Sequence, residues 1–324
     1  MIQLPQRSVL TIATGKPIYI ELAINLARSF KWWHKDSSIQ FVLATDQKHL
    51  IPPDLLDIEI IELQPGQYGY GFSPKLHLDE LAPAAQTLFV DADCLCVGSL
   101  ESVFDRFAGH AVSVVGRTIS EGEWFGDVAT ICSQFNVKAL PRFNGGVYYL
   151  KPGNICTQVY STARDLELKY DEIGFTRLRN RPNDEVIMAL SMAIHGQSPI
   201  PEDGTIMNST LACPGGLKID VLKGEARLFN PYNHPNHNSW YELEEMNPVL
   251  VHFLSHQTTL HPYVREKIKL DLTMARGWSA WLARLWANTA FSYPWLIKKL
   301  FKDFLRPVYH KLLRPRTIKI SERI

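Results

Sequence analysis

The sequence predicts an α/β protein with a mostly parallel central sheet that is flanked by helices. Strand-like and helical stretches alternate over residues 9–90, which is typical of parallel strands joined by crossover helices. The strand-like stretches are short runs of apolar and β-branched residues, as in strands that are buried on both faces. Several of these runs end in polar residues, and ligands of such sheets bind beyond the carboxyl ends of the strands. The sequence therefore predicts a ligand site along that edge of the sheet.

The first half of the sheet is expected to contain four short strands. Pro17 follows the first strand and suits the first position of a helix, in which apolar residues then recur at helical spacing. Residues 64–72 are rich in Gly and Tyr, and we expect a mobile loop there. The expected elements, in chain order, are strands over 9–13, 39–44 and 57–63, a helix over 75–81 and a strand over 87–90.

The stretch from residue 99 to residue 254 is less regular. Residues 117–142 are charged and contain a tryptophan, and we expect them to form a lid or acceptor loop. Ser99 and Asn154 are expected to cap helices, because both residue types are favoured at that position. The expected elements are a helix from Ser99 to Phe107, strands over 111–115 and 147–150, a helix from Asn154, a helix over 184–193 and a strand over 249–254.

Two carboxylates end the fourth predicted strand. Asp91 and Asp93 follow the buried run 87–90 and are separated only by Ala92. In an extended chain residues i and i+2 point the same way, so the two carboxylates can converge on one point. Two hard oxygen donors there suit Mg²⁺ or Mn²⁺ carrying phosphates, since desolvated like charges need a cation. A strand-end turn with two solvated aspartates is the alternative interpretation.

Three other groups of polar residues stand near predicted strand or helix ends. In Asn144-Gly145-Gly146, the two glycines let the backbone approach a ligand closely, and a β-bulge is the alternative. Asp184-Glu185 begins a predicted helix, where acids also serve simply to complement the helix dipole. His252 lies inside an apolar strand, where a satisfied core histidine is the alternative to a ligand.

The order of these motifs resembles that of the retaining glycosyltransferases related to glycogenin and to the galactosyltransferases of bacterial lipopolysaccharide synthesis, glycosyltransferase family 8. The resemblance extends over residues 8–256 and includes the Asp-x-Asp motif. It implies a GT-A fold, a nucleotide-sugar donor that is most often UDP-linked, and Mn²⁺ or Mg²⁺ as cofactor. It also implies transfer of a hexose with retention at the anomeric carbon, to a glycan, lipid-linked or protein acceptor.

The resemblance also assigns roles to residues of this chain. Asp91, Asp93 and His252 would bind the metal, while Thr14 and Tyr19 would hold the uridine. Asn144 would lie near the sugar, and Asp184 and Glu185 beside the reacting centre, so these three are the catalytic candidates. The complete set expected around the donor and the metal is Thr11, Ala13, Thr14, Tyr19, Lys75, Asp91, Ala92, Asp93, Asn144, Gly145, Gly146, His252 and His256.

The sequence departs from the family pattern at three positions. Ser255 stands where the family has glycine, and Thr258 where it has a lysine that contacts the diphosphate. His256, His261 or Arg265 are candidates to supply the missing positive charge. Glu185 replaces a glutamine, which places a further acid near the sugar.

Two other functions are compatible with these motifs. A protein that binds a nucleotide sugar without turnover would account for the missing lysine. A phosphatase of the haloacid dehalogenase type also has Asp-x-Asp after an apolar strand. Three strands precede the motif here, and no late acidic pair stands where a second metal-binding loop of a phosphatase would be expected. Glycosyl transfer is therefore the favoured interpretation.

The composition is that of an ordinary globular protein. Of 324 residues, 46% are hydrophobic and 21% charged, and the net charge of +1 argues against a nucleic-acid partner. Five cysteines, an odd number without zinc-ribbon spacing, favour a reducing compartment. Met1–Ser8 has no signal-peptide core, and no apolar run reaches the roughly 18 residues needed to span a bilayer. We therefore expect a cytoplasmic protein.

The C-terminal segment differs from the rest, so we expect a catalytic domain over 1–271 and a helical extension over 272–324. The extension has 11 Lys or Arg against two acidic residues, a net charge of +9, which leaves −8 on the remainder. Aromatic and basic residues alternate over 276–316, as in helices that lie on an anionic membrane surface. Pro294 and Pro307 are expected to divide this segment into short helices. The expectation is peripheral contact with the inner face of a membrane, and the alternative is a helical pair packed on the catalytic domain.

Overall fold

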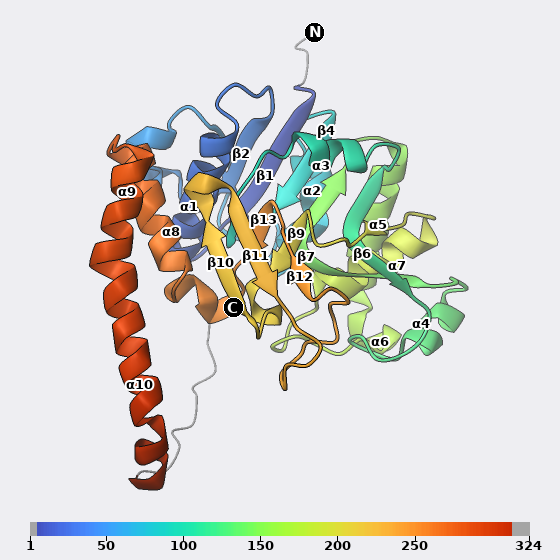
Figure 1. The fold of residues 1–324 in the computed structure, drawn as a ribbon. Helices are drawn as coiled ribbons and strands as arrows, with labels where there is room; N and C mark the ends of the chain where they lie inside the picture. Colours follow the sequence, from blue (N-terminus) through green and yellow to red (C-terminus); the bar gives the residue numbers. More distant parts are fainter. Residues whose placement is uncertain (1–4, 313–324) are drawn as a thin grey trace.

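A seven-stranded sheet forms the centre of the molecule in the computed structural model, which describes residues 5–312 (Figure 1). Its strand order is β3-β2-β1-β4-β7-β6-β8, and two three-stranded sheets, β5-β13-β9 and β10-β11-β12, lie beside it. The strands are β1 (Arg7–Ala13), β2 (Gln40–Thr45), β3 (Glu59–Glu62), β4 (Gln86–Val90), β5 (Cys94–Cys96), β6 (Val112–Ile119), β7 (Leu140–Leu150), β8 (Ile200–Pro201), β9 (Met207–Ser209), β10 (Gly216–Asp220), β11 (Glu225–Phe229), β12 (Glu245–Met246) and β13 (Leu250–His252).

Helices cover both faces of the central sheet. The α-helices of the described chain are α1 (Pro17–Trp33), α2 (Leu78–Leu81), α3 (Glu101–Arg106), α4 (Val128–Gln134), α5 (Asn154–Leu168), α6 (Tyr170–Ile173), α7 (Asp184–Ile194), α8 (Tyr263–Leu270), α9 (Ala280–Ala287) and α10 (Tyr293–Leu312). The strands are buried on both sides, because successive residues enter opposite cores. Leu88 and Val90 of β4 pack into the core beneath α1, while Phe89 packs into the core beneath α5 and α7.

The sheet combines a parallel half with an antiparallel half. The pairs β1–β2, β2–β3 and β1–β4 are parallel, as the strand–helix alternation predicts. β7 runs antiparallel between β4 and β6, with Val90 opposite Val147. The backbone N–H of Asp91 donates to the carbonyl of Gly146 at 3.0 Å, just beyond the end of this pairing. The strand order thus places the end of β4 beside residues 144–146.

A second pairing joins the end of β4 to a distant part of the chain. β5 follows Asp93 directly and pairs antiparallel with β13, so that Cys94 lies opposite His252. The N–H of Phe253 donates to the carbonyl of Asp93 at 3.0 Å. His252 therefore lies beside the aspartate pair, although it is far away in the sequence.

Several elements differ from those that periodicity predicts. β7 begins at Leu140, so Asn144-Gly145-Gly146 lies inside the strand instead of before it. Pairing of β6 with β7 shifts register between Val114 and Gly116. A shift of this kind agrees with the β-bulge that was the alternative expectation for these glycines. The expected lid over 117–142 contains the short helix α4 and extensions of both strands. The two strands are longer than predicted because they pair with each other, and such pairing cannot be predicted from local composition.

Two expected helix caps are also wrong. Leu100 and Gly153 occupy the cap positions of α3 and α5, and Asn154 is the first residue of its helix. Ser99 still accepts a hydrogen bond from the N–H of Glu101.

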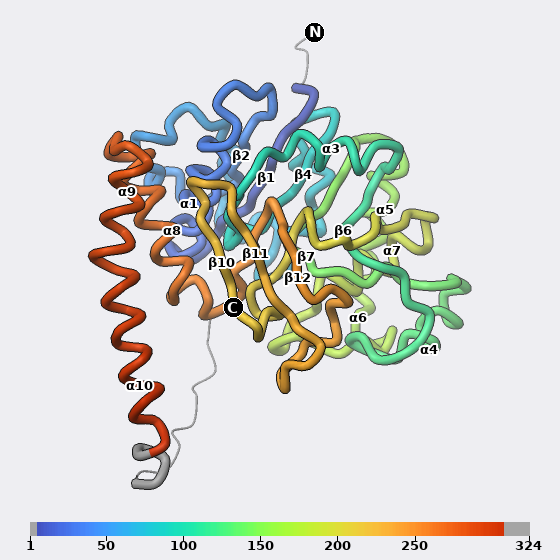
Figure 2. Tube along the Cα trace, viewed as in Figure 1, coloured from blue at the N-terminus to red at the C-terminus, as the bar shows by residue number. Residues whose placement is uncertain are grey.

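α9, the turn that follows it and α10 form a long rod along one side of the molecule, and α10 extends well past the body (Figures 1 and 2). We call these elements the rod. α8 and α9 are followed by π-helical turns over Asp271–Ala275 and Asn288–Ser292, and the second turn leads directly into α10. Pro307 lies inside α10, so the expected break into short helices is wrong. Because this helix is exposed, water can bond the carbonyl that loses its donor there. Among the described residues, no helix combines the length and the hydrophobicity of a bilayer-crossing segment.

Candidate functional site

A cavity of about 780 Å³ lies beyond the carboxyl ends of β1 and β4, where parallel sheets bind ligands. We call it the main cavity. It brings together residues from β4, β7, α7 and β13, and from the turns that follow β1 and precede α2. The sequence-predicted site residues that line it are Thr14, Tyr19, Lys75, Asp91, Ala92, Asp93, Asn144, Gly145, Asp184, Glu185 and His252.

One buried histidine faces both carboxylates of the Asp-x-Asp motif. His252 Nε2 lies 2.9 Å from Asp93 Oδ1 and 3.8 Å from Asp91 Oδ2. The imidazole is 2% exposed, yet Nε2 is not aligned for a hydrogen bond with any described residue. A buried polar atom without a hydrogen bond is costly. Such an atom between two carboxylates fits a cation that all three side chains share.

Asn144 orients this histidine. Its side-chain oxygen lies 2.9 Å from His252 Nδ1 and also accepts the N–H of Gly146 at 3.1 Å. An amide oxygen accepts, so Nδ1 carries the hydrogen, and in the neutral imidazole Nε2 then presents its lone pair toward the aspartates. This is the arrangement of metal-binding histidines, in which the second ring nitrogen donates to an outer acceptor. Burial lowers the pKa of His252, but Asp93 and Asp91 outweigh burial and raise it, because they stabilise positive charge at this point.

Lys75 holds the carboxylates of two elements together. Its ammonium donates to Asp91 Oδ2 at 2.8 Å and to the Gly145 carbonyl at 2.9 Å, and it lies 3.7 Å from Asp184 Oδ2. Burial lowers its pKa, but the acids of the cavity, Asp184 first, raise it above the usual value. The cavity therefore keeps this lysine charged and already paired.

The acids at the start of α7 have different surroundings. Asp184 is 2% exposed and accepts the hydroxyl of Tyr148 at 2.6 Å. Glu185 Oε1 accepts the N–H of Gly145 at 2.7 Å. Burial and the neighbouring Asp184 raise the pKa of Glu185 to about 7. Asn183 caps the helix by accepting the N–H of Glu185, and both acids lie in the first turn, where they complement the helix dipole. The helix dipole does not explain why both acids also line the cavity.

Cys94 is an additional neighbour of this cluster. Its thiol, Asp93 and His252 have potential ligand atoms within 4.8 Å of one another. Mg²⁺ and Mn²⁺ prefer oxygen and imidazole ligands to thiols. The two aspartates and the histidine are therefore better suited to such a cation than the thiol is. Cys94 is fully buried opposite His252 in the β5–β13 pairing.

Four predicted site residues lie outside the lining. Thr11 and Ala13 are buried in β1, and the Thr11 hydroxyl has no hydrogen-bond partner among the described residues. His256 is exposed on the turn after β13. Gly146 lies behind His252, and a Cβ there would be 2.6 Å from the Nδ1 atom of that histidine. Glycine is thus required at 146 by the position of the imidazole.

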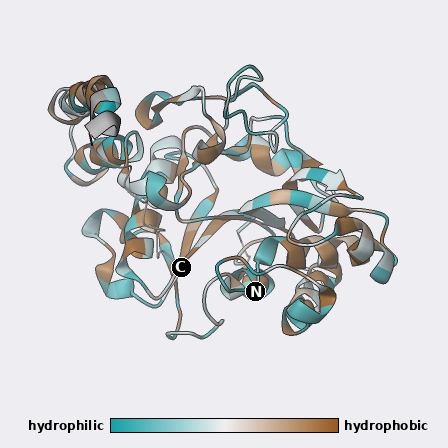
Figure 3. Cartoon of the chain, turned by 90° about the horizontal axis from the view of Figure 1, so that it is seen from below, coloured by the Kyte–Doolittle hydropathy of each residue, from teal (hydrophilic) through white to brown (hydrophobic). Residues whose placement is uncertain are grey.

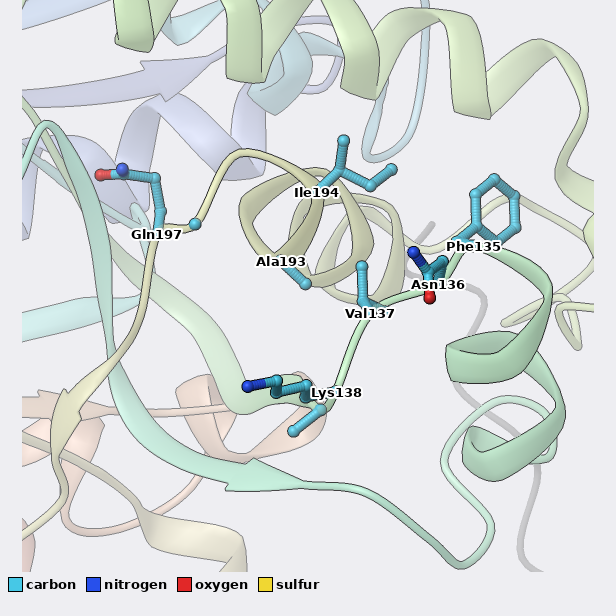
Figure 4. A pocket seen from close by; sticks show the side chains of 9 residues that line it. Phe135, Asn136, Val137, Lys138, Ala193, Ile194 and Gln197 are labelled. Atoms are coloured by element: carbon cyan, nitrogen blue, oxygen red, sulfur yellow. The ribbon is translucent and has the colours of Figure 1, made fainter.

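A second hollow, of about 450 Å³, lies between the end of α7 and the segment after α4 (Figure 4). Lys138 is the one charged side chain among its lining residues, which include Phe135, Val137 and Ile194. It has neither paired acids nor a histidine. Of these two cavities, only the main one therefore has the chemistry suited to a metal and a phosphate.

Sequence comparison finds no matching family model and no matching curated protein. Two solved structures of the galactosyltransferase LgtC match with TM-scores of 0.52 and 0.53 at 11% and 12% identity. They cover 87% and 86% of this chain and 95% and 99% of their own. The chain has the GT-A fold. This confirms the fold that the sequence resemblance implies.

One of the LgtC structures contains donor and acceptor sugar analogues, and the other is an active-site variant with glutamate in place of glutamine. The glycosyltransferase GlyE of Streptococcus pneumoniae TIGR4 also matches, with a TM-score of 0.41 at 15% identity. That match covers 60% of this chain and 44% of GlyE, so the chain spans less than half of that protein.

The main cavity of this GT-A chain has further lining residues that sequence reasoning did not assign to the site. Asp46 follows β2 and accepts the N–H of Gly15 through both carboxylate oxygens at 3.1 Å. Its position at a strand end was the available signal. Arg179 and Arg181 come from the turn before α7, for which no motif gave a signal. The Gly- and Tyr-rich loop also contributes, through Pro65, Gly66, Gly69, Tyr70, Gly71 and Phe72.

Proposed function

We propose that this protein is a metal-dependent retaining glycosyltransferase that moves a hexose from a nucleotide sugar, UDP-linked in the first instance, to an acceptor hydroxyl. The observation that carries the proposal is the convergence of Asp91, Asp93 and Nε2 of His252 in one cavity at the ends of parallel strands. The GT-A fold is consistent with it.

Asp91, Asp93 and His252 would hold Mn²⁺ or Mg²⁺. When bound, the ion acts as a Lewis acid toward the diphosphate and stabilises the negative charge of the leaving nucleoside diphosphate. Asn144 positions His252 for this role through the hydrogen bond to Nδ1. Lys75 holds the Asp91 carboxylate in place and adds positive charge near the same phosphates.

The acids of α7 would face the sugar, which becomes positively charged at its anomeric carbon during transfer. Asp184 is oriented by Tyr148 and lies near Lys75, so a carboxylate at this point can stabilise that charge or hold a sugar hydroxyl. Glu185 stands where the resembling family has glutamine. Its hydrogen bond with the N–H of Gly145 keeps it beside the same position.

The nucleoside would lie toward β1 and β2. Thr14 and Tyr19 line that part of the cavity, and Asp46 fixes the turn at Gly15 between them. The sugar and diphosphate would then extend over Gly145 toward α7.

A panel of nucleotide sugars tests the proposal. Full-length protein is incubated with UDP-, GDP- and ADP-linked hexoses and Mn²⁺, and nucleoside diphosphate release and thermal shift are measured. We expect a Mn²⁺-dependent thermal shift and slow release of the diphosphate with one class of donor. Asp91→Asn and Asp93→Asn should abolish both, because each removes an anionic ligand of the metal. Full activity in excess chelator would contradict the role of the metal.

The same panel separates the other functions. Binding of a donor with neither transfer nor hydrolysis would identify a binding protein without turnover. Release of phosphate from sugar phosphates, without any response to nucleotide sugars, would identify a phosphatase.

We further propose that the rod brings the enzyme to an anionic membrane surface that carries a lipid-linked acceptor. Apolar side chains of α10 are well exposed, among them Leu300 at 69%, Phe301 at 66% and Phe304 at 81%. Lys298, Lys299 and Lys302 lie on the same helix. In Figure 3, which views the rod nearly end-on, its ribbon carries both hydrophobic and hydrophilic colours. Exposed apolar and basic side chains together are suited to a headgroup layer.

Liposome flotation tests this second proposal. Full-length protein should float with anionic liposomes at low salt and stay unbound with neutral liposomes. Replacing Lys298, Lys299 and Lys302 by glutamate should abolish flotation. Side chains over 308–312 are not described, and Arg314 and Arg316 lie outside the described residues, so the variants are confined to the visible part of the rod. Equal behaviour with both liposome types would contradict the proposal.

A further inference from the structure

The main cavity is rich in acids for a site that would bind a diphosphate. Asp46, Asp91, Asp93, Asp184 and Glu185 all line it. A divalent cation can balance the two metal-binding aspartates, but the diphosphate adds further negative charge. The site therefore needs positive side chains that are available to the ligand.

Most of the cavity's positive charge is already engaged. Lys75 is paired with Asp91 and lies near Asp184, and Lys16 has an interaction partner of its own. The other two basic lining residues are Arg179 and Arg181. Within residues 5–312, neither guanidinium forms a hydrogen bond or an ion pair, whereas the nearby Arg177 is held by Asp171 at 2.6 Å.

A strained turn presents these two arginines. The backbones of Leu178 and Arg181 exchange hydrogen bonds of 2.9 and 3.0 Å, which closes a tight hairpin. Arg179 and Asn180 at its tip have φ values of 52° and 63°, in the left-handed region that residues other than glycine rarely adopt. Strained backbone of this kind is often found at ligand-binding positions.

The opposite loop leaves space for Arg181. Gly71 has φ of +71°, and a Cβ there would lie 2.8 Å from both Cδ and Nη1 of Arg181. The arginine thus crosses from the α7 side of the cavity to the Gly- and Tyr-rich loop. Arg181 is half-buried, between two loops that line the same cavity as the aspartate pair.

We propose that Arg181, supported by Arg179, binds the diphosphate of the nucleotide-sugar donor. This inference rests on the proposed function. A guanidinium can donate two parallel hydrogen bonds to a phosphate, and it keeps its charge whatever the local pH. Arg181 would thus supply the positive charge that the resembling family obtains from a lysine at the position of Thr258. It would do so from a different part of the fold.

The three residues that the sequence suggested as replacements for the missing lysine do not line the main cavity. His261 stacks on Trp295 at the base of the rod, with ring centroids 4.5 Å apart. Arg265 is bound to Glu266 and to the carbonyl of Ile219. His256 is exposed and does not line the main cavity.

Calorimetric titration in the presence of Mn²⁺ tests the assignment. The full-length protein is first titrated with UDP, GDP and ADP to choose the base, and the chosen diphosphate is then compared with its monophosphate. Arg181→Gln should weaken binding of the diphosphate by about 10- to 100-fold, the effect expected for hydrogen bonds to a charged group, and should affect the monophosphate much less. Arg181→Lys should give an intermediate loss, because it keeps the charge but not the bidentate geometry.

Arg177→Gln is the matched control, since Arg177 lies in the same segment but its guanidinium is turned to Asp171. It should bind both nucleotides as the wild type does. Wild-type affinity for the diphosphate in Arg181→Gln would overturn this inference and leave the proposed function standing. If the wild type itself binds none of the three diphosphates, both are overturned. Should Arg181→Gln fail to fold, unchanged diphosphate affinity in Arg181→Lys would overturn the inference in its place.

Discussion

At the scale of single residues, the site depends on how each polar side chain is paired. Asn144 accepts the Nδ1–H of His252 and so turns Nε2 toward the aspartates, as the proposed metal site requires. Tyr148 and Lys75 similarly hold Asp184 in place at the cavity. The identities of most of these residues could be predicted from motifs. Their partners could not, because a motif names a side chain without stating what it contacts.

Glu202 provides a test of burial at a single residue. Burial, with a smaller contribution from Glu242, raises its pKa from 4.5 to about 7, against the opposing effects of Arg117 and Arg142. Between those two pH values the folded state binds more protons than the unfolded state, so the free energy of unfolding falls as pH rises through this window. We expect Glu202→Gln to be more stable than the wild type at pH 8, by about 1–2 kcal/mol, since partial exposure reduces the full effect of the shift.

Urea denaturation of both proteins from pH 4 to pH 9 measures this difference. The difference should be small near pH 4.5, grow up to about pH 7 and stay constant above it. The weak contact of Asn208 with Oε1 of residue 202 is kept in the variant, which isolates the charge. A difference that does not change with pH would contradict the prediction.

At the scale of elements, two strand pairings assemble the site. β4 pairs with β7 and β5 with β13, which brings Asp91, Gly146 and His252 together. Helical and strand periodicity predicted most of these elements. It could not predict the pairings, because they join segments that are far apart in the sequence.

Gly146→Ala tests the close contact between β7 and β13. The new Cβ would lie 2.6 Å from Nδ1 and 2.9 Å from Cε1 of His252, so the imidazole must move. We expect the variant to fold, with about 1–3 kcal/mol lower stability from overpacking, and to lose Mn²⁺ affinity by at least about tenfold. Electron paramagnetic resonance of free Mn²⁺ measures the affinity. Gly98→Ala, whose Cβ would meet a side-chain methyl of Val249 at 3.2 Å, should retain it.

A buried ion network joins α8 to the β10–β11 hairpin. Lys269, which is 1% exposed, lies 3.0 Å from Glu266 and 3.2 Å from Asp220. Glu266 also accepts the N–H of Val221 at 2.8 Å. We expect Lys269→Met to lower the free energy of unfolding by about 1–3 kcal/mol. Glu266 and Asp220 lose their most deeply buried cation but keep their ion pairs with Arg265 and Arg284, so the cost is below that of an uncompensated buried charge.

The double variant Lys269→Met with Glu266→Gln separates the loss of the Lys269–Glu266 pair from the burial of a carboxylate that only Arg265 still compensates. The glutamine side chain would still accept the Val221 N–H through its amide oxygen, so the double variant should be more stable than Lys269→Met alone. Denaturation curves with equal slopes for all proteins would support two-state analysis. If the double variant loses as much stability as Lys269→Met and Glu266→Gln lose together, the two residues are not coupled, which would contradict the prediction.

At the scale of the whole molecule, the rod is the feature that stands apart from the GT-A body. α9 packs against α8, and His261 stacks on Trp295, but the described side chains of α10 beyond that point, up to Pro307, are largely exposed. An exposed apolar face of this length indicates a surface that another phase or molecule covers. α9 thus packs on the body, in line with the alternative expectation of packed C-terminal helices, whereas the exposed part of α10 does not.

Phe301→Ser combined with Phe304→Ser tests that description of the rod. The two rings are 66% and 81% exposed, so their loss should change the free energy of unfolding by less than about 0.5 kcal/mol. The same double variant should bind anionic liposomes more weakly, because about 25 cal/mol is lost for each Å² of apolar surface that no longer enters the headgroup layer. A destabilisation of several kcal/mol would show that the rod packs on the body in solution.

The sequence by itself determined the parallel half of the sheet, the carboxylate pair that ends β4 and the order of motifs that indicated a GT-A fold. These features are local, because strand alternation, helical spacing and short motifs are written in neighbouring residues. The tertiary structure decided which distant segments share the cavity, including the hydrogen bond from His252 to Asn144 and the turn that carries Arg179 and Arg181. It also decided that α10 continues through Pro307 and stands away from the body. Long-range strand pairing and packing determine these features, and no periodicity within a short window of sequence contains them.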